Sequence, residues 1–133
     1  MERLTNQEFN DSMRERTKKF ALQVIALSDN LSGKESAKVI NRQLLRSATS
    51  VAANFRAACR GRSKAEFYSK ICIVVEEADE TQFWFEMLAD SKLMVNNHSD
   101  VMKLISEISE ILAITTSIKN KLYQNNETVK SKI

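Results

Sequence analysis

The chain contains no proline and only two glycines, Gly33 and Gly61, among its 133 residues. β-Sandwiches and α/β folds need glycine and proline in turns at regular intervals, whereas long helices exclude both residues. The scarcity of these two residue types therefore predicts an all-α fold. Because domains of about 100–150 residues are common, we expect a single domain over residues 1–133.

Apolar residues that recur at three- and four-residue steps predict four helices. We expect these helices at residues 11–31, 36–60, 64–92 and 99–124, followed by a polar tail, 125–133, that frays. The links between them are short, about two to five residues, and such links join antiparallel neighbours. The pattern therefore predicts an antiparallel up-down-up-down four-helix bundle.

Three small residues mark the predicted boundaries between the first three helices. Gly33 can adopt the left-handed conformation that many helix ends require, and Gly61 ends the second helix. Ser63 is the predicted N-cap of the third helix, and Glu66 three residues later completes a capping box. A link at residues 96–98 is expected to lead into the fourth helix.

The predicted third helix is apolar around most of its circumference. Phe83, Trp84 and Phe85 point in three different directions, because successive residues are about 100° apart on a helix. A helix that faces water on one side does not need so many large apolar groups. We therefore expect this helix to be covered from two directions, by its own bundle and, as an open alternative, by another subunit.

Residues 36–65 contain seven basic residues and no acidic one, although the net charge of the chain is only +3. At about 100° per residue, Arg42, Arg46, Arg56 and Arg60 fall within about 40° of one line on a helix. The apolar residues of the same stretch lie on the other side. This predicts an amphipathic helix whose polar face is an arginine stripe formed by these four residues, which suits a polyanion or an acidic protein surface.

Two interpretations of the arginine stripe remain open. In one, the arginines form a solvated face that pairs with Glu76, Glu77 and Glu80 on the adjacent helix. In the other they bind phosphate, for which the forked guanidinium group is well suited. The candidate nucleic-acid-binding residues are then Arg42, Arg46, Arg56, Arg60, Arg62 and Lys64. Few aromatic residues lie among them, which favours readout of backbone and shape over base stacking.

A second line of small polar residues runs beside the arginine stripe. Its members are Gln43, Ser47, Ser50 and Asn54. Small residues let helices approach closely, and hydroxyl and amide groups can form hydrogen bonds between helices. We therefore predict that this line serves packing.

The residues that enzymes and metal sites require are scarce. His98 is the only histidine, no Glu-x-x-His pattern of a di-iron site occurs, and there is no glycine-rich phosphate loop. Cys59 and Cys72 lack metal-ligand spacing and are expected to be buried free thiols in a reducing cytoplasm. We expect no enzymatic activity, no metal and no cofactor.

The chain also lacks the pattern of a targeting or membrane-spanning segment. The N-terminal sequence MERLTNQEF has no apolar region typical of a signal peptide. No run approaches the ~20 apolar residues that a membrane span needs. We expect a soluble, cytoplasmic protein with no membrane partner.

A family resemblance is carried by residues 43–67, QLLRSATSVAANFRAACRGRSKAEF. This stretch resembles the four helix bundle proteins related to the protein encoded in intervening sequences of bacterial 23S rRNA genes. Their pattern is approximately Gln-[Leu/Ile]-x-Arg-[Ala/Ser]-[Ala/Ser]-x-Ser-[Val/Ile]-x-x-Asn, then a linker, then Ser-x-x-[Glu/Asp]-Phe. The matching positions are Gln43, Leu44, Arg46, Ser47, Ala48, Ser50, Val51, Asn54, Ser63, Glu66 and Phe67. A weaker resemblance extends over residues 10–124.

The chain departs from the family pattern at one point. After the asparagine the family commonly continues with Ile-Ala-Glu-Gly, whereas this chain has Phe55-Arg56-Ala57-Ala58. An acidic residue is lost and an arginine is gained. The role of that glutamate in relatives therefore cannot be carried over to this chain.

The resemblance implies an antiparallel four-helix subunit and, as in known relatives, a ring-shaped homopentamer. A related branch, the accessory protein of diversity-generating retroelements, binds a reverse transcriptase and nucleic acid through a basic surface. No catalytic residues are known for the family. The partners that the resemblance implies are therefore further copies of the chain, RNA or DNA, and a reverse transcriptase or other protein.

The residues and the resemblance together lead to one hypothesis and one alternative. The hypothesis is a non-enzymatic, homopentameric helical-bundle protein that binds RNA or DNA through the arginine stripe with Arg62 and Lys64. The alternative is a protein–protein adaptor or structural ring with no nucleic-acid role, whose arginines pair across subunits or dock an acidic partner.

Overall fold

The computed structural model describes residues 6–31, 33–93 and 98–131, with side chains described as far as residue 125. Four helices occupy these ranges: α1 (Asn6–Ser28), α2 (Glu35–Cys59), α3 (Lys64–Asp90) and α4 (His98–Ser131). No described residue belongs to a strand. The prediction of an all-α chain with four helices is confirmed.

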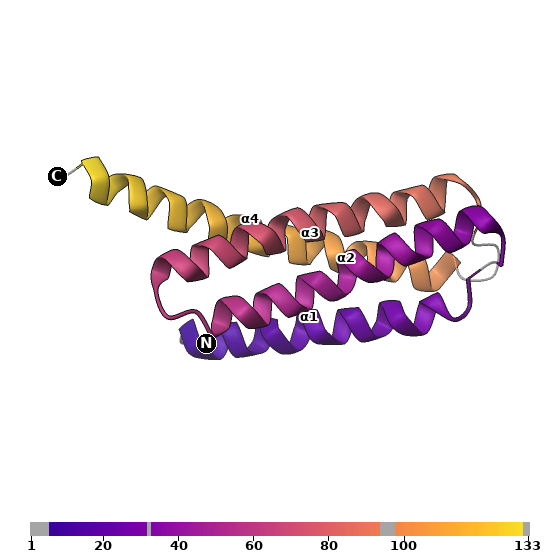
Figure 1. The fold of residues 1–133 in the computed structure, drawn as a ribbon, viewed down its shortest axis with the longest axis horizontal. Coiled ribbons are helices and arrows are strands. Elements are labelled where there is room, and N and C mark those ends of the chain that lie inside the picture. Colours follow the sequence, from indigo (N-terminus) through magenta and orange to yellow (C-terminus); the bar gives the residue numbers. More distant parts are fainter. Residues whose placement is uncertain (1–5, 32, 94–97, 132–133) are drawn as a thin grey trace.

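The four helices lie side by side, and successive helices begin at opposite ends of the molecule (Figure 1). α2 packs against α1 and α3, while α4 packs against α3 and, less extensively, against α1. In the described ranges the backbones of α1 and α3 make no contact, nor do those of α2 and α4. The result is a four-helix bundle in which every helix has two neighbours and one outer face.

The core is one continuous apolar cluster to which each helix contributes a buried stripe. Two aromatic rings meet at its centre, where Phe20 of α1 and Phe85 of α3 pack edge to face with ring centroids 6.3 Å apart. Such aromatic pairs stabilise a core by about 0.5–1.5 kcal/mol beyond the area that they bury. The diagonal helices α1 and α3 are therefore joined through side chains rather than through their backbones.

α1 lies closer to the N-terminus than predicted. It begins at Asn6 because the turn that it adds carries Phe9, which packs half-buried against the core. It ends at Ser28. There the amide N–H of Asn30 donates to the carbonyl oxygen of Leu27, three residues back, at 2.9 Å, whereas an α-helix would use the fourth residue back. This shorter-range bond tightens the last turn and terminates the helix.

Neither glycine adopts the left-handed conformation, so the prediction made for Gly33 is wrong. The described residue with positive φ is Lys92, at 60°, just after α3 ends at Asp90. Gly61 is required because a side chain would not fit at this position, and not because of its backbone conformation. A Cβ atom there would lie 3.1 Å from the carbonyl oxygen of Ala58.

The predicted cap of α3 is present. The Oγ of Ser63 accepts a hydrogen bond from the amide N–H of Glu66 at 3.1 Å. The carboxylate of Glu66 accepts from the amide N–H of Arg62 at 2.6 Å, one residue earlier than in the usual capping box. The two hydrogen bonds fix the basic loop between α2 and α3.

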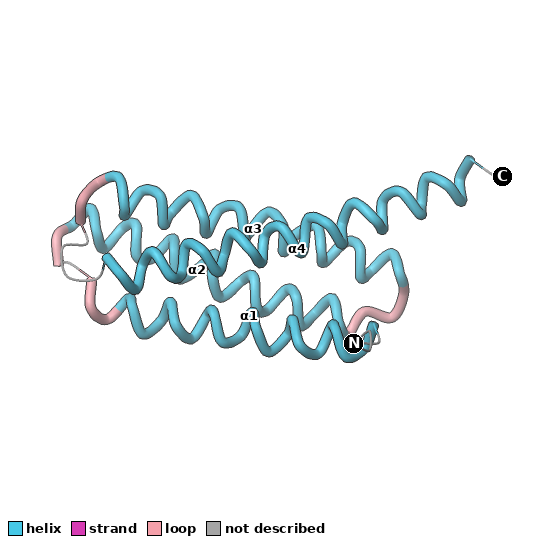
Figure 2. The backbone as a smooth tube through the Cα atoms, turned by 180° about the vertical axis from the view of Figure 1, so that it is seen from behind, coloured by secondary structure: helices cyan, strands magenta, loops and turns pink. Residues whose placement is uncertain are grey.

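α4 continues past its predicted end at residue 124. It is helical as far as Ser131, and its last turns extend beyond the other helices (Figures 1 and 2). No glycine or proline follows Gly61 in the sequence, so no backbone preference stops the helix where packing ends. Of the predicted link, His98 begins α4, whereas Asn96 and Asn97 lie outside the described residues, as do residues 132–133.

Candidate nucleic-acid interface

α2 carries its apolar and basic residues on opposite faces, because both classes recur at helical spacing. Val51 and Phe55 are fully buried in the core. On the opposite face Arg42, Arg56 and Arg60 are exposed to solvent. Three of the four members of the arginine stripe are therefore available to a ligand.

Arg46, the fourth member, is ion-paired with α3. Its Nη2 lies 3.2 Å from Oε2 of Glu77 and also contacts the carboxylate of Glu80. The hydrogen bonds with Glu77 and Glu80 raise the pKa of Arg46. The same Glu80 carboxylate accepts a hydrogen bond from Nε1 of Trp84 at 3.3 Å. Arg46 thus joins α2 to α3, and the two carboxylates offset its charge.

Arg56 and Arg60 lie beside two basic residues of α1, Arg14 and Lys18. The four side chains surround a hollow of about 480 Å³ between the two helices, here called the α1–α2 basic groove. Its lining residues are Arg14, Glu15, Lys18, Ala52, Ala53, Arg56 and Arg60. Four cations face one carboxylate, so the groove is positively charged. The alanines have short side chains, which leaves room for a ligand between the cations.

Sequence reasoning missed Arg14 and Lys18. Their spacing of four residues places them on one face of α1, and this is the only local signal that they carry. Which helix packs beside the arginine stripe, and at what height, depends on the tertiary fold. Arg14 is also ion-paired with Asp11 at 3.4 Å, which restrains it at the edge of the groove.

The remaining predicted residues extend the basic surface in both directions from the groove. Arg42 lies about 21 Å from Arg56 along α2, at about 1.5 Å per residue. Arg62 and Lys64 follow Arg60 in and just after the α2–α3 loop. No described carboxylate forms an ion pair with Arg42, Arg56, Arg60, Arg62 or Lys64.

The line of small polar residues beside the stripe contributes one bond between helices. Thr81 of α3 donates a hydrogen bond to Oγ of Ser47 at 2.9 Å, and both residues are fully buried. The side-chain amide of Asn54 instead bonds within α2, to the carbonyl oxygen and the Oγ of Ser50, both at 2.9 Å.

Cys59 and Cys72 are free and half-buried, less enclosed than predicted. Cys59 borders the N-terminal half of α1, where its thiol lies 3.9 Å from the carbonyl oxygen of Asn10. Burial raises the pKa of the Cys59 thiol, which keeps it protonated at neutral pH. No group of three or more His, Cys, Asp or Glu side chains suited to a metal occurs among the described residues, and His98 is exposed.

A separate ion-pair cluster joins α1 to α4. Nε and Nη2 of Arg16 donate to the two carboxylate oxygens of Glu107 at 2.9 and 2.7 Å, and Nη2 also lies 2.9 Å from Glu110. The hydrogen bond with Arg16 lowers the pKa of the Glu107 carboxyl. These carboxylates, unlike Glu77 and Glu80, lie on the far side of the bundle from the stripe.

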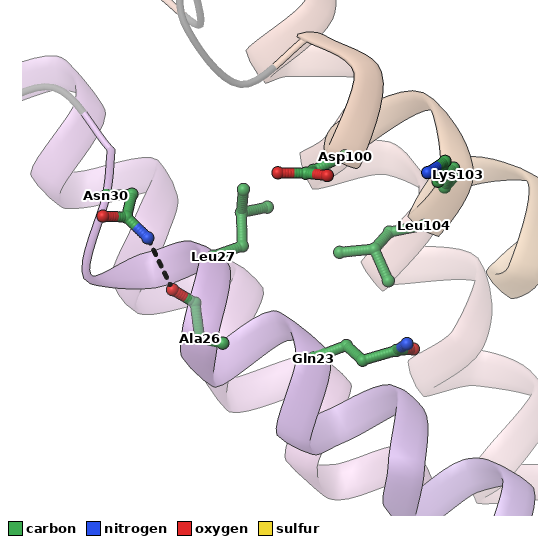
Figure 3. A pocket seen from close by; sticks show the side chains of 7 residues that line it. All are labelled: Gln23, Ala26, Leu27, Asn30, Asp100, Lys103 and Leu104. Atoms are coloured by element: carbon green, nitrogen blue, oxygen red, sulfur yellow. Dashed lines mark hydrogen bonds between the residues drawn. The ribbon is translucent and has the colours of Figure 1, made fainter.

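A second hollow, of about 250 Å³, lies farther along the contact between α1 and α4. Figure 3 shows the side chains that line it. Leu27 of α1 and Leu104 of α4 approach it from opposite sides, and Asp100 and Lys103 lie at its α4 edge. The side-chain amide of Asn30 donates to the carbonyl oxygen of Ala26 at 3.2 Å and is thereby occupied within α1. One carboxylate and one amine do not assemble a catalytic site.

Within the part of the chain that the structure describes, no helix is long and apolar enough to cross a membrane.

The molecule is a four-helix bundle with a basic face on α1 and α2. A model of the 23S rRNA-intervening sequence protein family matches residues 10–117. The chain therefore belongs to the 23S rRNA-intervening sequence protein family, which confirms the resemblance inferred from residues 43–67.

A solved structure is similar over most of its length. It is the crystal structure of a protein of unknown function from the S23 ribosomal protein family of Bacteroides thetaiotaomicron. The two sequences are 28% identical, the TM-score is 0.74, and the match covers 84% of this chain and 97% of that one. No curated protein matches this chain.

Proposed function

We propose that this protein is a non-enzymatic member of its family that binds the phosphate backbone of RNA or DNA through its basic face. The observation that carries the proposal is the α1–α2 basic groove, where Arg14, Lys18, Arg56 and Arg60 converge from two helices around one hollow. Converging cations raise the local potential, and a phosphate group between them lowers the energy of the cluster.

The lack of aromatic side chains on this face indicates how a nucleic acid would bind. The exposed aromatic residues among those described are Phe83 on α3 and Tyr123 on α4, away from the groove. Single strands are held chiefly by bases that stack on aromatic rings. The groove therefore favours the backbone of paired strands, bound with little sequence preference.

The proposal extends to the architecture that the family resemblance implies. The helices would be antiparallel, and five subunits would form a ring in which the groove is repeated. Repetition of one weak site raises the overall affinity without any new contact. The ring would act in the cytoplasm, where Cys59 and Cys72 stay reduced, as an accessory to a nucleic-acid enzyme such as a reverse transcriptase.

One observation favours the alternative, a protein–protein adaptor or structural ring without a nucleic-acid role. Arg46 already uses its charge in an ion pair with Glu77 and Glu80. If Arg42, Arg56 and Arg60 pair with carboxylates of a neighbouring subunit or of an acidic partner in the same way, the stripe serves assembly.

Filter binding of a 20-base-pair RNA duplex and of the same sequence as DNA tests the proposal. We expect retention at low salt that falls steeply with salt concentration, because each phosphate contact releases counterions. Arg56→Glu should weaken binding about tenfold or more. Lys103→Glu, on the far side of the bundle from the stripe, is the matched control and should have a much smaller effect.

Two outcomes contradict the proposal. One is the absence of retention of both duplexes at low salt. The other is dissociation of the oligomer by a chain carrying Arg42→Glu and Arg46→Glu, which would assign the stripe to assembly. Loss of duplex binding with the oligomer intact supports the nucleic-acid role.

A further inference from the structure

Two pairs of large apolar side chains are exposed on opposite sides of the bundle. Leu22 and Ile25 of α1 are 55% and 43% exposed, and Phe83 and Met87 of α3 are 47% and 40% exposed. Spacings of three and four residues place each pair on one face of its helix. Because α1 and α3 are diagonal in the bundle, their outer faces point in opposite directions. Grouped apolar side chains on a surface mark an interaction site.

Charge surrounds the α3 pair. Residues three, four and seven positions from Phe83 are its neighbours on the helix surface, and all of them except Met87 are acidic. These acidic neighbours are Glu76, Asp79, Glu80, Glu86 and Asp90. Glu80 is paired with Arg46, whereas the other four form no ion pair with any described residue. Two copies of this face would repel one another, so a symmetric α3–α3 contact is unfavourable.

The α1 pair has a different electrostatic environment. Lys18 and Lys19 precede Leu22 by one helical turn, and both are exposed. Two carboxylates also lie two turns from Leu22, Glu15 before it and Asp29 after it. Lys19, which lies outside the α1–α2 basic groove, can therefore face the acidic neighbours of Phe83 when the two apolar pairs come together.

Two hydrogen bonds between helices give the relative heights of α1, α2 and α3 along the bundle. The side-chain amide of Asn41 on α2 donates to Oγ of Ser28 on α1 at 3.0 Å. Thr81 on α3 donates to Oγ of Ser47 on α2 at 2.9 Å. Each bond marks a level at which residues of two neighbouring helices lie side by side.

The two apolar pairs lie at the same height. α1 and α2 run in opposite directions in Figure 1. Leu45, four residues after Asn41, is therefore level with Val24, four residues before Ser28. α2 and α3 also run in opposite directions. Leu45, two residues before Ser47, is therefore level with Phe83, two residues after Thr81. Phe83 is therefore level with the middle of the Leu22–Ile25 pair, on the other side of the molecule.

We propose that a second copy of this chain docks the outer face of its α1 onto the outer face of α3. Leu22 and Ile25 of one copy pack against Phe83 and Met87 of the next. The two surfaces differ, so the contact is heterologous, and contacts of this kind generate rings or filaments. Since both surfaces lie at one height, successive copies need no shift along the bundle axis, which favours a closed ring.

This contact rests on the self-association included in the proposed function, and it names the surfaces that would produce it. It leaves the outer face of α2, with Arg42, Arg56 and Arg60, free for a ligand. It also accounts for the apolar residues of α3 that the subunit itself leaves exposed.

Disulfide crosslinking tests the contact in a background carrying Cys59→Ala and Cys72→Ala. A chain carrying both Leu22→Cys and Phe83→Cys should yield a series of covalent multimers on a non-reducing gel after mild oxidation. Either single variant alone should yield none, and a mixture of the two single variants should yield dimers. Leu22→Cys combined with Tyr123→Cys, an equally exposed site on α4, is the matched control and should not crosslink.

Light scattering on the unmodified chain separates the possible failures. A monomer shows that self-association itself is absent, which overturns the ring and this contact together. An oligomer without crosslinking between positions 22 and 83 assigns assembly to other surfaces and overturns this inference alone. Crosslinking by Phe83→Cys on its own shows a symmetric contact and overturns it as well.

Discussion

Arg16 of α1 holds Glu107 of α4 through two parallel hydrogen bonds, at 2.9 and 2.7 Å, and so joins the first helix of the chain to the last. Both side chains are slightly less than one-third exposed. The hollow of Figure 3 lies on the same contact, which is the least extensive between neighbouring helices. At this contact the ion pairs of Arg16 with Glu107 and Glu110 add to the apolar core that α1 and α4 share.

This pair makes stability depend on pH in a defined direction. The pKa of Glu107 is lowered in the folded protein, chiefly by the hydrogen bond from Arg16. The stabilisation from a lowered pKa is complete above the unfolded value, about 4.3 for glutamate. It is lost as the pH falls through the folded pKa. We expect Glu107→Gln to lower the free energy of unfolding by about 1–2 kcal/mol at pH 7.

Urea denaturation from pH 7 to pH 2.5 measures this effect. The difference between the unmodified chain and Glu107→Gln should stay constant above about pH 5.5 and shrink below about pH 4. Glu86→Gln, at an exposed α3 site without a described ion pair, is the control and should show little difference at any pH. A difference for Glu107→Gln that persists unchanged at pH 2.5 would exclude this role.

The buried hydrogen bond between Ser47 and Thr81 predicts a non-additive pair of substitutions. Thr81→Val keeps the shape of the side chain but removes a hydrogen-bonding partner of the Ser47 hydroxyl in the core. We expect a loss of about 1–2 kcal/mol in the free energy of unfolding. Ser47→Ala combined with Thr81→Val should lose less than the sum of the two single changes, because each single change already removes the hydrogen bond that joins Ser47 to Thr81. Additive losses in thermal or urea unfolding would contradict this prediction.

The two glycines form a matched pair for a packing test. At Gly61 a Cβ would meet the carbonyl oxygen of Ala58 at 3.1 Å and Cβ of Glu66 at 3.3 Å, so Gly61→Ala should destabilise the fold by about 1–3 kcal/mol. At Gly33 nothing lies within 4 Å of the added atom, and φ is not positive. Gly33→Ala should therefore be neutral or stabilise by up to about 1 kcal/mol. Equal effects of the two substitutions on the melting temperature would refute the space argument.

The α1–α2 basic groove predicts which charges contact phosphate. Arg56 and Arg60 form no ion pair with a described carboxylate. Arg56→Ala and Arg60→Ala should each lower the slope of log K against log salt concentration for a duplex by about one, because one phosphate contact is lost. Arg46→Ala should change this slope little, since its charge is offset by Glu77 and Glu80. It should instead lower stability by about 1 kcal/mol or less, because the ion pair is partly exposed. A salt titration that gives Arg46 the larger effect would contradict the groove.

Local features could be predicted from the sequence because their causes lie within a few residues. The missing prolines, the helical spacing of apolar residues and the cap at Ser63 indicated four helices and the start of α3. The ends of α1 and α4 were less predictable. Phe9 extends α1 because a core is available to it, and α4 continues to Ser131 because no residue stops it.

The candidate site could be predicted only in part. The arginine stripe follows from the spacing of Arg42, Arg46, Arg56 and Arg60 on one helix. The ion pairs of Arg46 and the contribution of Arg14 depend on which helix lies beside α2 and at what height. No spacing within α2 contains that information.

By itself the sequence determined the fold class, the amphipathic character of α2 and the family. The fold class and the amphipathic character follow from backbone preference and from periodicity, which act between residues close in the chain. The family follows from the resemblance carried by residues 43–67. The tertiary structure decided that Arg46 is neutralised by α3, that Arg56 and Arg60 share a groove with Arg14 and Lys18, and that apolar pairs on α1 and α3 are exposed at one height. Those facts depend on the rotation and axial position of each packed helix, which the buried core sets through contacts between distant residues.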